Sequence, residues 1–492
     1  MTAAMTALWT SEEAARATGG ATDRPWRASG VSIDTRRLEA GDLFVALKGP
    51  NFDGHDFVAA ASGNGAAAAV VSRDFEAGRG TTPLLRVDDT TRALRDLGKA
   101  ARARCPAKRI AITGSVGKTG TKEAVRCGLA PQGRTYASAG NLNNAYGVPL
   151  SLSRLPRDSE YAVFELGMNH GGEISELTRM VAPNIAVITT IEPVHLEFFQ
   201  SIAGVADAKA EIFEGMTGGT AVLNRENPFF HYLSEKADRA GIARILSFGA
   251  HPDADARLHA YRSQEFAGEA GANIGSEIGS EVEAVVMGSP LRYAIGLPGR
   301  HSALNSLAAL AAIHAAGGDI ETAAAHFATL SPLQGRGARQ RLRLDCGPVT
   351  LIDETYNASP AATRAALQVF GDLAPEGNGR RIFVLGDMLE LGPEAERLHR
   401  ALARDISAAQ VARVFTVGPL AASLMADLPA DKRARAVEQA ADLAEPLLAE
   451  LQAGDIVLIK GSAGVALHRL RDALLSASRV DRPVRDRPAK EA

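Results

Sequence analysis

Cysteine is scarce in this chain of 492 residues, and neither sign of charge is in large excess. The three cysteines, Cys105, Cys127 and Cys346, lie far apart and form no CxxC pair. This spacing argues against a zinc ribbon or a disulfide framework and favours a reducing compartment, the cytoplasm. The net charge at pH 7 is −3, so no basic field favours nucleic acid or an anionic membrane. Any site that binds phosphate must therefore depend on groups near the site and not on the overall charge of the protein.

Long apolar runs are missing as well. No run of about 18 apolar residues occurs, so we expect no membrane-spanning helix. The N-terminus carries Glu12 and Glu13 and lacks the apolar segment of a secretory signal. Hydrophobic residues make up 46% of the chain and charged residues 23%, which is typical of a globular protein. At roughly 150 residues per domain, the length predicts about three domains.

The sequence divides into three predicted α/β domains and a charged tail, at residues 1–106, 107–330, 331–478 and 479–492. In the first, apolar runs at 42–47 and 66–71 predict short strands, and 90–104 predicts a helix.

Apolar runs of strand length alternate with helical spacing in the second and third domains. The second has strands at 109–112, 161–164 and 185–188 and a helix at 202–213, which predicts a mostly parallel sheet with helices on both faces. Residues 252–290 break this pattern and predict a surface excursion or hairpins. The third has strands at 349–353, 382–385, 414–417 and 456–459, which predicts a Rossmann-like domain. Residues 332–339, rich in Gly, Arg and Pro, are the expected hinge.

The most specific motif is TGSVGKT at 113–119, between a predicted strand and a predicted helix. Gly114 and Gly117 allow the backbone to fold around a phosphate, and the helix N-terminus adds a partial positive charge. Lys118 can reach the β- and γ-phosphates of a nucleotide, and the Thr119 hydroxyl can bind Mg²⁺. The motif therefore predicts a nucleotide site.

Two further features, Glu165 and the GNLNN segment, offer polar groups that could act together with this loop. Glu165 ends an apolar strand, where a carboxylate can hold Mg²⁺ opposite the phosphate loop. Residues 140–144, GNLNN, offer amide donors and acceptors that suit a sugar or peptide substrate.

The phosphate loop is a shortened form, with Ile112 where the longer loop has its first glycine. In this it resembles the loop of the Mur ligases and of the related folylpolyglutamate synthases. Both families use ATP to phosphorylate a carboxylate and then form an amide. The resemblance extends in chain order through GNLNN, ELGMNH at 165–170, EPVHLE at 192–197 and GDMLELG at 386–392. These strings are similar to those of Mur ligases that add D-alanyl-D-alanine to a UDP-linked muramoyl tripeptide.

The resemblance implies roles for individual residues. It implies that ATP is bound by Gly114, Ser115, Gly117, Lys118, Thr119, Asn305, Arg336 and Asp353. It implies that catalysis uses Lys118, Glu165, His195 and Lys209, and that two Mg²⁺ ions are bound by Thr119, Glu165, His195 and a carbamylated Lys209.

The implied substrates are UDP-N-acetylmuramoyl-tripeptide and D-alanyl-D-alanine, bound by a monomer. Their expected contacts are Ser32, Asp34, Arg36, Lys48, Asn141, Asn143, Asn144, Tyr356, Asn357 and Lys460. The chain departs from the family pattern at Ser302, Ser359 and Ala463, which leaves the roles of these positions open.

Three alternatives remain at this point. A sister Mur ligase would add another amino acid, but the third domain has no DNPR-like segment and ELGMNH favours the dipeptide ligase. Residues 32–36, 44–49 and 53–55 resemble the UDP-binding first domain of the Mur ligases. A folylpolyglutamate synthase would lack such a first domain and the GNLNN and ELGMNH strings. A P-loop ATPase that acts as a switch on a protein partner would need neither the asparagine cluster nor the set of Glu, His and Lys after the strands.

Overall fold

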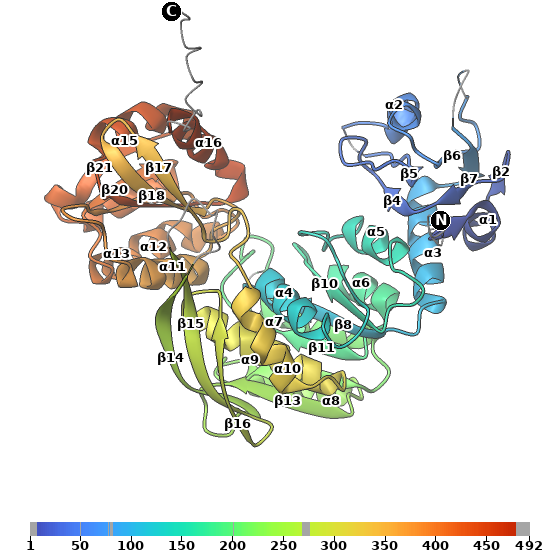
Figure 1. Cartoon of the computed structure of the whole chain (residues 1–492), viewed down its shortest axis with the longest axis horizontal. Coiled ribbons are helices and arrows are strands. Elements are labelled where there is room, and N and C mark those ends of the chain that lie inside the picture. The colour runs from blue at the N-terminus through green and yellow to red at the C-terminus, as the bar shows by residue number, and fades with distance from the viewer. Residues whose placement is uncertain are drawn as a thin grey trace, which may run out of the picture.

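A computed structural model of the chain describes residues 7–49, 51–76, 78, 82–199, 201–267 and 276–478. Three α/β parts are arranged with the central part at the base and the N- and C-terminal parts rising on either side (Figure 1). The predicted tail at 479–492 lies outside the described residues. Within the described ranges, no helix is both long and apolar enough to span a bilayer.

The N-terminal part contains a five-stranded sheet in the order β2-β7-β6-β5-β4, parallel except for β2. Its strands are β2 (Ala21–Thr22), β4 (Gly30–Ser32), β5 (Asp42–Val45), β6 (Ala68–Ser72) and β7 (Leu84–Val87). A separate pair joins β1 (Trp9–Thr10) to β3 (Arg27–Ala28), and the helices are α1 (Ser11–Thr18), α2 (Val58–Gly63) and α3 (Thr90–Ala103). Both predicted strands and the predicted helix are confirmed. The strand β5 ends two residues early because the Leu47 N–H bonds to the Val45 carbonyl and turns the chain.

The central part is built on nine strands in the order β16-β15-β14-β13-β12-β11-β8-β10-β9. They are β8 (Lys108–Thr113), β9 (Thr135–Ala137), β10 (Tyr161–Glu165), β11 (Ile185–Ile188), β12 (Thr220–Asn224), β13 (Arg244–Gly249), β14 (Ala256–Ala267), β15 (Ser276–Val286) and β16 (Ser289–Ile295). Pairing is parallel from β9 to β14 and antiparallel from β14 to β16. The hairpins predicted around 252–290 are therefore confirmed.

Helices cover both faces of this sheet, as predicted. They are α4 (Lys118–Leu129), α5 (Gly147–Ser153), α6 (Glu173–Val181), α7 (Ile202–Ala210), α8 (Phe230–Arg239), α9 (Arg300–Ala315) and α10 (Ile320–His326). Successive strand residues point to opposite faces. Ile110 and Ile112 therefore join the core under α4 and α9, while Ala111 joins the core on the other face. The helix predicted at 202–213 is α-helical only to Ala210 and continues as a 3-10 turn to Gly215.

The C-terminal part has six strands in the order β17-β18-β22-β19-β20-β21, parallel except for β17. They are β17 (Ala338–Leu344), β18 (Gly347–Glu354), β19 (Arg381–Gly386), β20 (Arg413–Val417), β21 (Arg433–Val437) and β22 (Ile456–Lys460). Its helices are α11 (Pro360–Asp372), α12 (Ala395–Arg400), α13 (Ala403–Ala408), α14 (Pro419–Ser423), α15 (Ala444–Glu450) and α16 (His468–Ala477). All four predicted strands are confirmed. The edge strands β17 and β21 were not predicted because arginine alternates along them.

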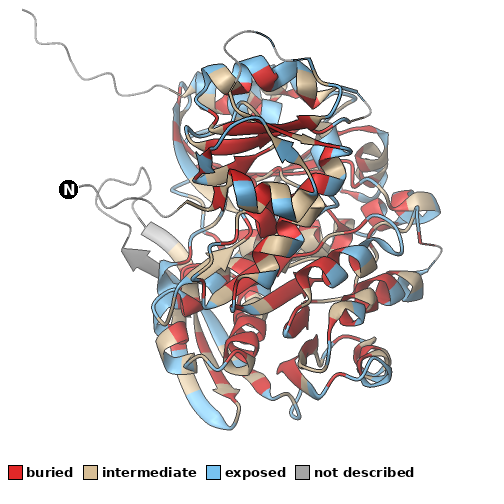
Figure 2. Ribbon diagram, turned by 90° about the vertical axis from the view of Figure 1, so that its right-hand side faces the viewer, coloured by how far each residue is buried: buried red, intermediate tan, exposed pale blue. Residues whose placement is uncertain are grey.

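The three parts share their cores unequally. One continuous apolar cluster includes Trp9 and Leu97 of the N-terminal part together with Phe164 of the central sheet. The C-terminal part has two clusters of its own, and the central-part side chains Leu196 and Ile278 pack against one of them. Figure 2 shows buried residues gathered along the strands and on the helix faces that cover them. The N-terminal and central parts therefore form one packed body, to which the C-terminal part is joined more lightly.

A buried carboxylate organises one end of the C-terminal sheet. Asp455 is fully buried and accepts hydrogen bonds from Arg380 N at 2.7 Å, Arg380 Nη2 at 2.9 Å and Gln452 N at 3.0 Å. We expect Asp455→Ala to lower the free energy of unfolding by about 3 kcal/mol, because it leaves these buried donors without their acceptor. Urea unfolding, in which the transition of the C-terminal part is followed, measures this loss. The exposed Asp431→Ala serves as the control and should stay within about 0.5 kcal/mol of the parent. Equal stability of the two variants would contradict the expectation.

Candidate active site

The phosphate loop lies at the carboxyl end of β8, where the order in which strands are added to the central sheet reverses. The strand β8 sits between β10 and β11, so the chain leaves it first to one side and later to the other, which opens a crevice at its carboxyl end. Gly114 and Gly117 have φ values of +141° and +88°. A Cβ at Gly114 would lie 2.0 Å from Thr189 Oγ1, and one at Gly117 would lie 2.7 Å from Asn305 Oδ1. Only glycine fits either position, and the loop leads directly into α4.

Lys118 is folded back over this loop. Its Nζ donates to the Gly114 carbonyl at 2.7 Å and to the Ser115 carbonyl at 3.4 Å. Burial lowers the pKa of Lys118, and repulsion by Arg336 adds to this effect, whereas attraction by Glu165 opposes it. A phosphate in the loop would compete with neutral carbonyls for this ammonium, and a charged acceptor binds it more strongly.

Glu165 connects the loop to the GNLNN segment. It ends β10, is 1% exposed, and accepts from Thr119 Oγ1 at 2.8 Å and from Asn143 Nδ2 at 2.7 Å. The structure thus brings together three side chains that the sequence indicated separately.

His195 and Lys209 lie near this group and near each other. His195 has a φ of +56°, and its Nδ1 lies 2.5 Å from Glu390 Oε2. Lys209 lies on α7 and is 1% exposed, and its amine makes no hydrogen bond or ion pair with any residue that the structure describes. Burial lowers the pKa of Lys209 well below its ordinary value, and the nearby charge of Lys118 lowers it further.

The donor set can be compared with the needs of Mg²⁺. Over the described ranges, no three side chains of His, Cys, Asp or Glu gather into a ready metal site. Thr119 and Glu165 nevertheless offer oxygens, which suits an ion that takes its other ligands from phosphate and water. His195 and Lys209 offer nitrogen only, and Lys209 gains oxygens only as a carbamate.

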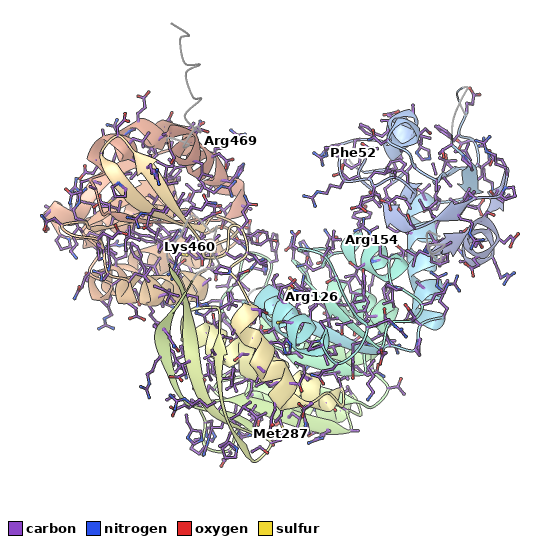
Figure 3. All side chains as sticks on the ribbon, viewed as in Figure 1. Phe52, Arg126, Arg154, Met287, Lys460 and Arg469 are labelled. Carbon is purple, nitrogen blue, oxygen red and sulfur yellow. The ribbon has the colours of Figure 1, made fainter. Side chains whose placement is uncertain are left out.

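A cavity of about 1120 Å³ joins the phosphate loop, Glu165 and His195 to the C-terminal part. From the central part it is lined by the phosphate loop, Asn141, Asn143, Glu165, His195, His301 and Asn305, and from the C-terminal part by Arg336, Glu354, Tyr356, Asn357 and Lys460. Figure 3 places Lys460 on the side of the C-terminal part that faces the central part. The cavity is large enough for a nucleotide with a second ligand beside it.

The C-terminal side chains in and beside the cavity are held by one another. The Arg336 guanidinium lies 3.8 Å from the centre of the Tyr356 ring. The buried Lys460 donates to Glu354 Oε2 at 2.9 Å and to the Asn357 carbonyl at 3.2 Å. These contacts keep the polar groups ordered on the wall of the cavity.

Asp353 lies behind that wall. Its carboxylate accepts from Gly335 N at 2.9 Å, from Thr355 Oγ1 at 2.6 Å and from Arg471 Nη1 at 3.1 Å. All three donors belong to the C-terminal part, so these bonds order Asp353 within its own domain, and its expected contact with ATP stays a prediction.

The expected UDP-binding residues lie apart from the cavity. Ser32 is the last residue of β4 and Asp34 follows it, where Arg36 Nη2 donates to Asp34 Oδ2 at 2.7 Å. Lys48 lies 3.8 Å from Asp53. Asn144, also expected at the substrate, accepts from Gly147 N at 2.9 Å and so holds the start of α5.

Sequence reasoning missed Lys122. It is fully buried, and its ammonium donates to the Ser138 carbonyl at 2.7 Å and the Gly140 carbonyl at 2.9 Å and pairs with Glu123 at 3.0 Å. Lys122 follows Lys118 by one helical turn, which was the available signal.

Two departures from the family pattern have local partners. Ser359 Oγ accepts from Ala362 N at 3.4 Å and caps α11, and Ser302 Oγ donates to the Pro298 carbonyl at 2.8 Å. Ser359 therefore caps its own helix, and Ser302 binds the backbone just before α9.

Comparisons with known proteins place this geometry in a family. Residues 27–102, 112–313 and 339–463 match, in order, the Mur ligase family catalytic domain, the Mur ligase middle domain and the Mur ligase glutamate ligase domain. The UDP-N-acetylmuramoyl-tripeptide–D-alanyl-D-alanine ligase of Rickettsia prowazekii is 34% identical over 94% of this chain and 99% of its own. The ligase of the same name from Escherichia coli is 36% identical over 90% and 93%.

Solved structures agree with these matches. The crystal structure of MurF from Acinetobacter baumannii has a TM-score of 0.78 at 30% identity and covers 95% of this chain and 99% of its own. MurF ligase from Thermotoga maritima in complex with ADP has a TM-score of 0.71 at 25% identity, over 91% and 97%. Because relatives of more than 30% identity match it over nearly their whole length, this chain belongs to the Mur ligase family.

Proposed function

We propose that this protein is the cytoplasmic ligase that joins D-alanyl-D-alanine to the terminal carboxylate of UDP-N-acetylmuramoyl-tripeptide in peptidoglycan precursor synthesis, with ATP as the energy source. The observation that carries the proposal is the phosphate loop facing Glu165 and Asn143 inside a cavity shared by two domains. The names of its full-length relatives support the choice of substrates.

The reaction has two steps. The tripeptide carboxylate attacks the γ-phosphorus of ATP, which forms an acyl phosphate and releases ADP. The free amine of D-alanyl-D-alanine then attacks the acyl carbon, phosphate leaves, and one proton is lost from the nitrogen. The phosphate loop and Lys118 stabilise the charge on the transferred group, and the enclosing cavity holds the reactants in line. Positioning and electrostatics thus supply the protein's share of the catalysis.

Two Mg²⁺ ions complete the charge balance in this proposal. Thr119 and Glu165 would hold one ion, and His195 with a carbamylated Lys209 would hold the other. Bound Mg²⁺ neutralises phosphate charge as it develops. Carbamylation requires a neutral amine, and burial, which lowers the pKa of Lys209 well below its ordinary value, favours the neutral form.

The remaining substrate contacts are also proposals. We assign the UDP group to the N-terminal part, with Ser32, Asp34, Arg36 and Lys48 as contacts. We assign the dipeptide to the C-terminal wall, with Tyr356, Asn357 and Lys460. Domain boundaries at 106 and 330, a hinge at 332–339 and a monomeric state are part of the same proposal.

The decisive test is a product assay by mass spectrometry. The enzyme is given ATP, D-alanyl-D-alanine and UDP-muramoyl peptides that differ in their terminal residue. We expect an amide product, and phosphate release only when both the tripeptide nucleotide and the dipeptide are present. Product formed with a single amino acid in place of the dipeptide would indicate a sister ligase. Phosphate release without the dipeptide, and without product, would indicate an ATPase switch.

Lys122 offers a separate test of the GNLNN segment. We expect Lys122→Met to raise the KM for the tripeptide nucleotide about 10-fold, since two carbonyl contacts worth about 1 kcal/mol each are lost and the segment loosens. The KM for ATP should change much less, because the phosphate loop keeps its own contacts. Steady-state kinetics measures both constants, with the exposed Lys99→Met as the matched control. Equal effects on the two substrates would contradict this role.

A further inference from the structure

The segment 386–392 of the C-terminal part, which leads from β19 towards α12, contacts His195 of the central part. Besides the contact between Glu390 Oε2 and His195 Nδ1 at 2.5 Å, Glu197 N donates to the Glu390 carbonyl at 3.2 Å. A Cβ at Gly392 would lie 3.3 Å from Glu197 Cα, so the two backbones touch. Between them, Leu196 packs against the cores of both parts.

This loop is anchored within its own domain. Met388 N donates to His399 Nε2 at 2.8 Å, and Leu389 N donates to Ser462 Oγ at 3.0 Å. Asp387 Oδ1 accepts from Ala421 N at 2.7 Å at the start of α14. The position of Glu390 is therefore set by the C-terminal domain as a whole.

Both partners adopt an uncommon backbone conformation. Glu390 has a φ of +63° and His195 a φ of +56°, and neither is a glycine. Such residues cost of order 1 kcal/mol each and persist only where the surroundings impose them, often at functional sites. The pairing is therefore a built feature of the interface.

The bond to Glu390 decides which nitrogen of His195 is available. With the proton on Nδ1, the imidazole donates to the carboxylate and leaves the Nε2 lone pair free. Nε2 makes no hydrogen bond with any described residue, and His195 lines the cavity. Metal-binding histidines in proteins generally donate the N–H of their other nitrogen to a carboxylate, a backbone carbonyl or water, which fixes the orientation of the ring.

We infer that Glu390 is a positioning residue that orients His195 for a divalent cation, so that the cation site is complete only when the C-terminal domain is docked. This inference rests on the proposed metal role of His195. It makes metal binding and domain docking reciprocally coupled, because each stabilises the arrangement that the other needs.

The test uses Mn²⁺ as the probe, titrated by electron paramagnetic resonance into the full-length enzyme with a non-hydrolysable ATP analogue. We expect Glu390→Ala to weaken the second Mn²⁺ site about 10- to 100-fold. Glu390→Gln should recover part of this loss, because its amide oxygen can still accept a hydrogen bond from the His195 Nδ1–H. The matched control is Glu394→Ala, in which an exposed pair with Arg397 is removed. An effect of the control as large as that of Glu390→Ala would overturn the inference.

His195→Ala separates this inference from the proposed function. If His195→Ala loses the second Mn²⁺ site and Glu390→Ala keeps it, the role of Glu390 is overturned, while the metal role of His195 stands. An unchanged second site in His195→Ala would overturn the metal role of His195, on which the inference depends. Nitrogen-15 spectra of the metal-free enzyme give a readout without metal or activity. We expect the Nδ1-protonated form of His195 in the parent and its loss in Glu390→Ala, and the Nε2-protonated form in the parent would overturn the inference.

Discussion

Replacement of Lys118 by alanine is expected to lower the rate of amide product formation about 10³-fold while leaving the fold intact. The ammonium lies on the phosphate loop, bonded to the Gly114 and Ser115 carbonyls, and becomes the nearest fixed positive charge to a phosphoryl group bound there. Without it, the charge that develops during phosphoryl transfer loses its main protein partner. The rate of product formation, followed by mass spectrometry at saturating substrates, measures the effect.

Two controls make the Lys118 result interpretable. Lys99→Ala removes an exposed lysine on α3 and should leave the rate unchanged. Circular dichroism and the melting temperature of Lys118→Ala should stay close to those of the parent, since among the described residues this ammonium bonds to two loop carbonyls and to no side chain. Undiminished product formation by Lys118→Ala would remove the basis of the proposed mechanism.

Replacement of Lys209 by methionine is expected to separate activity from stability. Product formation should fall about 10²- to 10³-fold, because an oxygen ligand of the second cation is lost. In buffer free of carbon dioxide, where Lys209 is an amine, stability should rise by about 1 kcal/mol, because a buried amine without a hydrogen-bond partner among the described residues gives way to an apolar chain of similar volume. Thermal unfolding in the absence of ligands measures the second effect.

The carbamate itself can be observed. In carbon-13-labelled bicarbonate, the parent enzyme should show one protein-bound carbamate resonance that Lys209→Met lacks. Lys99→Met is the matched control and should keep both the resonance and the activity. If Lys209→Met loses neither activity nor a carbamate signal, then Lys209 is a structural residue and the second metal site has other ligands.

The elements that sequence reasoning found share a physical reason. The strands β8, β10 and β11 are continuous apolar runs because both of their faces are covered, and such runs are visible without any structure. The phosphate loop can be recognised in the sequence because positions 114 and 117 must be glycine, since a Cβ at either would clash with Thr189 or Asn305. Polar edge strands such as β17 were missed, since pairing at an edge needs no apolar pattern.

The sequence by itself determined the three α/β domains, the phosphate loop and the family, because each is written in local spacing or in motifs along the chain. Only the tertiary structure decided which side chains meet. Glu390 is far from His195 in the chain, and Lys122 reaches the Ser138 and Gly140 carbonyls across a loop. The tertiary structure also showed that the Lys209 amine has no hydrogen-bond partner among the described residues and that the Asp353 carboxylate is held by hydrogen bonds within its own domain. Burial and partner geometry arise when distant segments pack, and no local pattern encodes them.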